Sequence, residues 1–121
     1  MITGVHTLVY AQDPDLARGF FRDVLGWPNV DAHDGWLIFG TGPSELGVHP
    51  ADGPPRHEIS LMCDDLERTI AELAGRGAQF EGEIADRSFG RCIDLKIPGA
   101  GVMLLYQLAH PVAYTLGSSA P

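Results

Sequence analysis

Lysine is nearly missing from this sequence. Lys96 is the only one, and the eight Lys and Arg residues face sixteen Asp and Glu residues, which gives a formal net charge of −8. The few basic residues are scattered, so no positive stripe could follow a phosphate backbone, and we expect no nucleic-acid partner. An acidic surface also repels anionic membranes, whereas it can help to attract a cationic ligand.

Long hydrophobic runs and cysteines are scarce as well. No window approaches the roughly eighteen apolar residues of a membrane span. The first residues have neither the basic region nor the apolar core of a secretory signal. The two cysteines, Cys63 and Cys92, are spaced like neither a zinc pair nor a redox motif. We therefore expect a cytoplasmic protein with two reduced thiols and no membrane partner.

One stretch of the chain occurs twice. Residues 5–13 read Val-His-Thr-Leu-Val-Tyr-Ala-Gln-Asp, and residues 56–65 read Arg-His-Glu-Ile-Ser-Leu-Met-Cys-Asp-Asp. In each copy a histidine, His6 or His57, begins an apolar strand that leads to an aspartate and then to a helical pattern. Such a repeat predicts two similar halves. We expect a single domain over 1–121, with repeat one at 1–52, repeat two at 53–108 and a tail at 109–121.

Hydrophobic periodicity predicts one helix and four strands in each repeat. The first helix, 15–25, follows Asp13-Pro14, and the second follows Asp64-Asp65. Asp34-Gly35 predicts a hairpin turn. The expected strands cover 4–11, 30–33, 36–40, 45–49, 57–63, 79–85, 91–97 and 102–107. The predicted class is therefore α+β, with two βαβββ repeats. A single repeat would leave one sheet face open, so a second unit, from the same chain or another, has to bury it.

Several of these pieces resemble the vicinal oxygen chelate superfamily, which includes glyoxalase I, fosfomycin-modifying enzymes, extradiol dioxygenases and bleomycin-binding proteins. The resemblance covers about residues 4–107. It is carried by residues 5–8, by 20–27 with its ending Leu-Gly-Trp, and by 45–50, 63–66 and 98–106. It implies a glyoxalase/dioxygenase-like fold whose eight strands form a cup around a cavity, usually closed by pairing halves in a homodimer.

The resemblance also implies where a metal would bind. The family uses positions at the start of strands one and five, here His6 and His57, and positions in strands four and eight, here Leu46 and Leu104. Two imidazoles suit Fe, Mn, Ni or Zn, but both carboxylate positions are apolar, so the cofactor is a divalent metal or none. The third ligand stays open among Glu45, His49, Gln107 and Tyr106. Strict strand alternation opposes the first three, and a β-bulge would reverse that.

The same alternation and the aromatic residues outline an apolar pocket with few polar groups, as small-molecule sites usually have. Arg91 is its candidate contact for an anionic or carbonyl-bearing ligand. In the tail, His110-Pro111 is predicted to be plain surface. The candidate pocket residues are Tyr10, Trp36, Val48, Leu61, Phe89, Arg91, Leu104 and Tyr106.

Two functions remain open, and both have a small molecule as partner. The first is a metal-dependent lyase or dioxygenase whose metal acts as a Lewis acid on a substrate with vicinal oxygens; the pair His6 and His57 favours it. The second is a metal-free protein that binds or sequesters a small molecule of the antibiotic type, favoured by Leu46, Leu104 and the charge of −8. A fold that has lost its earlier function is a third reading. The sequence identifies no catalytic acid, base or nucleophile.

Overall fold

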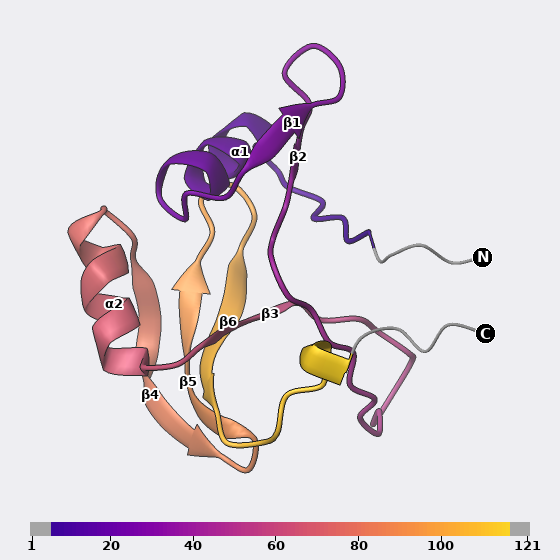
Figure 1. The fold of residues 1–121 in the computed structure, drawn as a ribbon, viewed down its shortest axis with the longest axis vertical. Helices are drawn as coiled ribbons and strands as arrows, with labels where there is room; N and C mark the ends of the chain where they lie inside the picture. The colour runs from indigo at the N-terminus through magenta and orange to yellow at the C-terminus, as the bar shows by residue number, and fades with distance from the viewer. Residues whose placement is uncertain (1–5, 117–121) are drawn as a thin grey trace.

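A computed structural model describes residues 6–116 and has a mixed α+β architecture, as expected (Figure 1). Neither helix in this part of the chain is long and apolar enough to cross a membrane. The elements are α1 (Pro14–Asp23), β1 (Asn29–Asp31), β2 (Leu37–Phe39), β3 (Ser60–Cys63), α2 (Leu66–Gly75), β4 (Phe80–Arg87), β5 (Gly90–Lys96), β6 (Val102–Leu108) and the short 3-10 helix η1 (Tyr114–Leu116).

The second repeat forms a four-stranded sheet in the order β3-β6-β5-β4. β3 runs parallel to β6, and the other two strand pairs are antiparallel. α2 supplies the crossover that carries the chain from β3 to the opposite edge of the sheet, at β4 (Figure 1). This is the strand-helix-three-strand order predicted for residues 53–108.

α2 covers one face of this sheet. Asp65 begins the helix because its side chain accepts the Arg68 N–H at 3.1 Å. Leu66 of α2 then packs against alternate residues of β5 and β6, among them Leu95 and Leu105, and these three are at most 2% exposed. Burying a leucine side chain contributes roughly 1.5–3 kcal/mol. The apolar stripe of α2 therefore fixes which face of the sheet becomes core.

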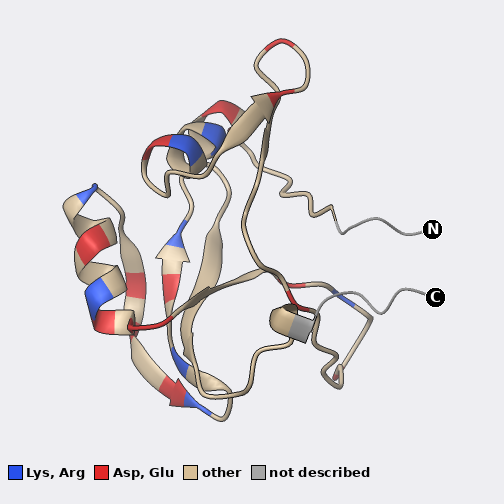
Figure 2. Ribbon diagram, in the orientation of Figure 1, with Lys and Arg blue, Asp and Glu red and all other residues tan. Residues whose placement is uncertain are grey.

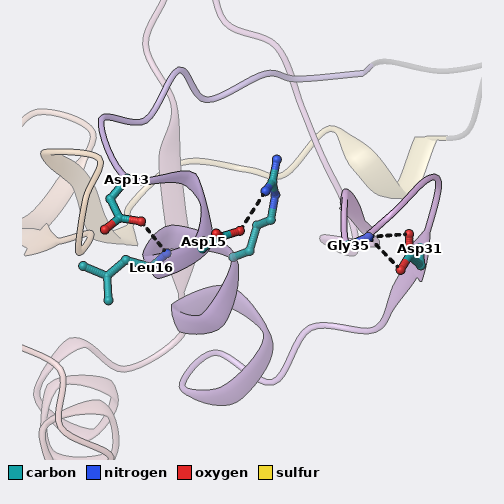
Figure 3. A network of polar contacts seen from close by, with 6 residues as sticks. Asp13, Asp15, Leu16, Asp31 and Gly35 are labelled. Atoms are coloured by element: carbon teal, nitrogen blue, oxygen red, sulfur yellow. Dashed lines mark hydrogen bonds and ion pairs between the residues drawn. The ribbon is translucent and has the colours of Figure 1, made fainter.

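The first repeat supplies α1 and a hairpin. Asp13 caps α1, since its Oδ1 accepts the Leu16 N–H at 3.1 Å (Figure 3). β1 and β2 pair antiparallel, which confirms the hairpin predicted from Asp34-Gly35. The Asp31 carboxylate accepts the Gly35 N–H at 3.0 Å and holds the turn (Figure 3). Gly35 has φ of 85°, a left-handed conformation that glycine adopts without strain.

Contacts between the repeats run through α1. Phe20 and Phe21 belong to the same buried cluster as the leucines under α2. The Asp13 N–H donates to the Gly99 carbonyl at 3.1 Å, and the Arg76 guanidinium donates to the Val24 carbonyl at 3.0 Å. These contacts hold α1 against one end of the sheet, where the chain turns between β5 and β6 (Figure 1).

Two expected strands are absent from the described residues. Residues 6–11 and 45–49 form no strand, and residues 4 and 5 of the first expected strand lie outside the described part. The side chains of Tyr10, Leu46 and Val48 are 91%, 81% and 93% exposed. A strand needs a partner for its N–H and C=O groups. The described chain supplies none for these segments, so residues 6–116 hold six strands in two sheets rather than a complete eight-stranded cup.

Candidate functional site

The four-stranded sheet has a second face, turned away from α2, which we call the open face. Met103 and Leu105 point into the core, so alternation puts Leu104 and Tyr106 on the open face. The register of the parallel pair sets Met62 directly beside Tyr106. β6 carries no charged residue, whereas the helices, β4, β5 and the loops carry most of the charges (Figure 2). The open face is therefore uncharged where β3 and β6 meet, and it is largely apolar apart from Ser60 beside Leu104.

A pocket of about 400 Å³ opens where the parallel strands β3 and β6 end. It combines apolar walls with a thiol, a carboxylate and an amide, the mixture that small-molecule sites use to hold and orient a ligand. The lining residues are Met62, Cys63, Asp64, Gln107, Leu108, Val112 and Tyr114. A second hollow of about 300 Å³ lies on the β1–β2 hairpin, but no acid, base or nucleophile lines it.

One wall of the larger pocket comes from the segment after β6. We call residues 109–114 the strap. It is held at its start by the Ala109 N–H, which donates to the Phe89 carbonyl at 2.9 Å, and farther on by the Ala113 N–H, which donates to Glu45 Oε2 at 2.8 Å. Between and after these anchors, Val112 and Tyr114 face the pocket. A loop of the first repeat thus helps to shape a pocket of the second.

A polar cluster lies beside the strap. His110 Nδ1 is 2.9 Å from the Pro111 carbonyl oxygen, which can only accept, so we assign a proton to Nδ1. In the neutral ring, Nε2 then accepts the Tyr106 hydroxyl at 3.2 Å. Glu45 Oε1 lies 3.8 Å from the same nitrogen. A protonated His110 can instead pair with the Glu45 carboxylate, whose side chain is only 15% exposed.

The surroundings of Tyr106 and Cys63 shift both of their pKa values upward. Burial is the main reason for the raised pKa of Tyr106, and the negative charge of Glu45 adds to it. Burial is also the main reason for the raised pKa of the Cys63 thiol, and the negative charges of Asp64 and Asp65 raise this pKa further. Both groups are therefore held in their protonated forms near neutral pH. As a thiol, Cys63 donates to the Tyr106 carbonyl at 3.5 Å and is a poor nucleophile.

Gln107 shows how the polar groups of the pocket are oriented. Its side-chain oxygen accepts the Leu66 N–H at 2.9 Å, at the first turn of α2. This hydrogen bond fixes the amide plane and leaves the NH₂ group as a donor at the pocket wall. Asp64 is exposed and lines the same pocket, where its carboxylate offers a negative charge to a ligand.

The described residues assemble no complete set of metal ligands around His6 or His57. His6 and His57 are both exposed, and no three His, Cys, Asp or Glu side chains among residues 6–116 come together as a ligand set. His49 turns its Nδ1 to the Pro50 carbonyl, at 2.7 Å. Leu46 and Leu104 offer no donor atoms at the two carboxylate positions. The side chains of the described residues therefore offer no ligand set that fits a divalent metal at His6 and His57.

Of the candidate pocket residues, three lie together. Leu104 and Tyr106 share the open face, and the Phe89 ring packs edge-on against Tyr106 with centroids 5.2 Å apart. Two residues considered only as metal ligands also belong to this region: Gln107 lines the pocket, and Glu45 contacts Ala113 and His110 of the strap. Strand alternation predicts that Leu104 and Tyr106 share a face, whereas it does not indicate the contacts of Phe89, Glu45 and Gln107.

The other candidates lie elsewhere. Leu61 packs against the core under α2 because its strand places it on that face of the sheet. Arg91 pairs with Glu67 of α2 at 2.6 Å and with Asp86 at 3.5 Å, so these acids engage its guanidinium.

Three more candidates are exposed on segments away from the pocket. Tyr10 and Val48 lie on the two unpaired segments. Trp36 is 57% exposed on the hairpin, where Arg18 stacks over its ring at 5.1 Å.

Sequence reasoning missed the strap and its neighbours. His110, Val112 and Tyr114 come from a tail without periodicity, and nothing in their spacing indicates that they return to the sheet. Met62 and Asp64 carried a better signal, because they end the strand that parallel pairing places next to β6.

The sequence profile of the Glyoxalase/Bleomycin resistance protein/Dioxygenase superfamily matches residues 4–97. No curated protein matches the sequence. Among solved structures, TnmS3, an antibiotic binding protein from Streptomyces sp. CB03234, is 22% identical with a TM-score of 0.63, and the match covers 89% of this chain and 98% of that one.

Two further structures share the fold. Lactoylglutathione lyase from Agrobacterium tumefaciens is 23% identical with a TM-score of 0.56, covering 84% of this chain and 90% of that one. A member of the same superfamily from Sphaerobacter thermophilus DSM 20745 is 20% identical with a TM-score of 0.61, covering 88% and 98%. Because these structures include a binder and a lyase, the fold they share is compatible with either function.

Proposed function

This chain belongs to the glyoxalase/bleomycin resistance protein/dioxygenase superfamily, and from that premise we propose that it binds and sequesters a planar, positively charged small molecule. The pocket between β3, β6 and the strap carries this proposal. Its apolar side chains, such as Met62 and Val112, suit a flat ring system, and the Asp64 carboxylate suits a positive charge. The net charge of −8 would draw a cation toward it.

Binding without catalysis agrees with the groups that the pocket offers. Cys63 is held as a thiol, and Gln107 is a neutral amide. Outside the pocket lining, Leu104 stands at a position where the superfamily resemblance implies a metal-binding carboxylate. A stoichiometric binder needs neither a metal nor a general base. TnmS3, which shares the fold, is an antibiotic binding protein, and its similarity supports a ligand of the antibiotic type for this chain.

We also propose that the working form is a homodimer in the cytoplasm. Tyr10, Leu46 and Val48 are large apolar side chains on unpaired segments, and such surfaces mark sites of association. A second copy would give these segments strand partners and help to close the open face. Cys63 and Cys92 are free, which supports a reducing compartment.

A metal-dependent lyase or dioxygenase is the second candidate. The observation that favours it is the placement of His6 and His57 at equivalent points of the two repeats, with both side chains exposed. Pairing of two chains would offer these imidazoles further ligands beyond those that residues 6–116 bring together. Metal content of the untagged dimer, compared with a His6→Ala/His57→Ala variant, separates this candidate from the binder.

The binding proposal is tested with proflavine, a planar aromatic cation, followed by fluorescence. We expect saturable binding that Asp64→Asn weakens about two- to fivefold, the effect of removing one partly exposed ion pair. Asp52→Asn, the same charge change in the exposed linker between the repeats, should leave the affinity unchanged. The anionic probe 8-anilinonaphthalene-1-sulfonate should bind more weakly than proflavine. Absence of saturable proflavine binding, or equal effects of the two substitutions, would contradict the proposal.

A further inference from the structure

Glu45 touches the strap although it is far from it in sequence. It comes from the loop that joins β2 to the second repeat, 68 residues before Ala113. Its two carboxylate oxygens have different neighbours: Oε2 accepts the Ala113 N–H at 2.8 Å, and Oε1 lies 3.8 Å from His110 Nε2. One side chain therefore contacts the strap at two points.

This carboxylate is unusual among the acidic residues of its loop. Glu58, for comparison, is 68% exposed and pairs only with its near neighbour Arg56 at 3.0 Å. Glu45 is 15% exposed. A charged group that has lost most of its water needs a hydrogen-bond partner in return, and here the Ala113 N–H of the strap provides one.

The strap has only one other backbone anchor in the described chain, the bond from the Ala109 N–H to the Phe89 carbonyl. That anchor fixes only the start of the strap. The residues that line the pocket lie farther along, where the Ala113–Glu45 hydrogen bond holds the chain. Val112 directly precedes Ala113, and Tyr114 directly follows it. The position of both pocket-lining side chains therefore depends on where Ala113 is held.

We propose that Glu45 is a positioning residue for the pocket: its carboxylate seats the strap at Ala113 and so places Val112 and Tyr114 against the ligand. The role in ligand binding rests on the function proposed above, whereas the seating of the strap does not. In this arrangement the first repeat positions the strap, although every residue that lines the pocket belongs to the second repeat or the strap.

Hydrogen exchange measures the seating without a ligand. In Glu45→Ala we expect the Ala113 amide to exchange about tenfold faster, the change that corresponds to losing one hydrogen bond to a charged group. The Ala109 amide should keep its protection, because its acceptor is the Phe89 carbonyl. Glu45→Gln, which keeps a neutral acceptor, should fall between the wild type and Glu45→Ala. Glu58→Ala serves as the matched control and should leave Ala113 unchanged.

Alkylation of Cys63 by iodoacetamide, followed by mass spectrometry, measures the pocket wall. Cys63 lines the pocket and is partly buried, so a loosened strap should raise its alkylation rate several-fold in Glu45→Ala and not in Glu58→Ala. Wild-type rates of both Ala113 exchange and Cys63 alkylation in Glu45→Ala would overturn the proposal. Loss of protection at Ala109 and in β5 as well would mean that Glu45→Ala unfolds more than the strap. The exchange at Ala113 and the alkylation of Cys63 are then compared between Glu45→Gln and the wild type.

Proflavine separates this inference from the binding function. If the strap positions the ligand, Glu45→Ala should weaken proflavine binding about tenfold, in step with the exchange at Ala113. Failure of the wild-type protein to bind proflavine would contradict the proposed function, while exchange and alkylation would still decide the seating. Unchanged proflavine affinity despite a loosened strap would overturn the positioning role.

Discussion

At the scale of single residues, the open face acquires its chemistry from contacts that strand periodicity does not predict. Tyr106 was a weak metal-ligand candidate on sequence grounds, and His110 was predicted to be plain surface. The structure joins them through a 3.2 Å contact and sets Glu45 beside them. Strand alternation predicted that Tyr106 faces a pocket. Its neighbours His110 and Glu45 lie in a tail and a loop whose sequences show no periodicity, so alternation could not predict them.

The raised pKa of Tyr106 gives a prediction at this scale. Burial, and then the charge of Glu45, disfavour the phenolate, so this phenol should ionise above the ordinary tyrosine pKa of 10.0. Because the folded state holds this proton more tightly than the unfolded chain, its contribution to stability is present below that value and is lost as pH rises through the folded-state pKa. Ultraviolet titration should show a late transition that Tyr106→Phe removes. Glu45→Gln should move the transition downward; an unmoved transition would contradict the role of the carboxylate.

At the scale of elements, the helices and the second repeat follow from the sequence because their signals are local. Caps such as Asp13, the apolar stripe of α2 and the alternation of β5 and β6 each act over a few residues. The expected strands 4–11 and 45–49 have comparable patterns, yet residues 6–11 and 45–49 form none. Alternation reports which face a segment would bury, but a strand exists only where a neighbour accepts its hydrogen bonds.

The junction between α1 and the turn after β5 gives a second prediction. A methyl group on Gly99 would lie 2.6 Å from the Asp13 carbonyl oxygen, and Gly99 has φ of +77°. Gly99→Ala should therefore destabilise the protein by about 1–3 kcal/mol through backbone strain, with the clash adding to it. The control is Gly53→Ala in the linker, where an added methyl meets no atom within 4 Å. Urea unfolding measures both, and equal midpoints would show that the junction adapts without cost.

At the scale of the whole molecule, one chain leaves apolar surface unburied. Tyr10, Leu46 and Val48 are all more than 80% exposed, although their alternation is that of buried strands. Exposing such apolar side chains to water costs free energy, and burial against a second copy would remove that cost. The segments predicted from the sequence as strands are thus the segments that the homodimer proposal depends on.

Light scattering coupled to size exclusion measures the association directly. The chain has a mass of 13.0 kDa, so a homodimer should give twice this value, about 26 kDa. Val48→Asp places a charge in the proposed interface and should shift the mass toward that of one chain. Val30→Asp makes the same change at a valine that is 66% exposed on β1, and should leave the dimer intact. A wild-type mass of one chain would contradict the homodimer.

The sequence by itself determined the α+β class, the family, both helices, the hairpin and the sheet of the second repeat, because caps, turns and periodicity are local properties. Only the tertiary structure decided which residues meet. It placed Leu61 in the core and engaged Arg91 with Glu67 and Asp86, whereas it brought Glu45 and His110 to Tyr106. These contacts depend on the conformations of the loops that pack against the sheet, and the periodicity of the sequence does not predict those conformations.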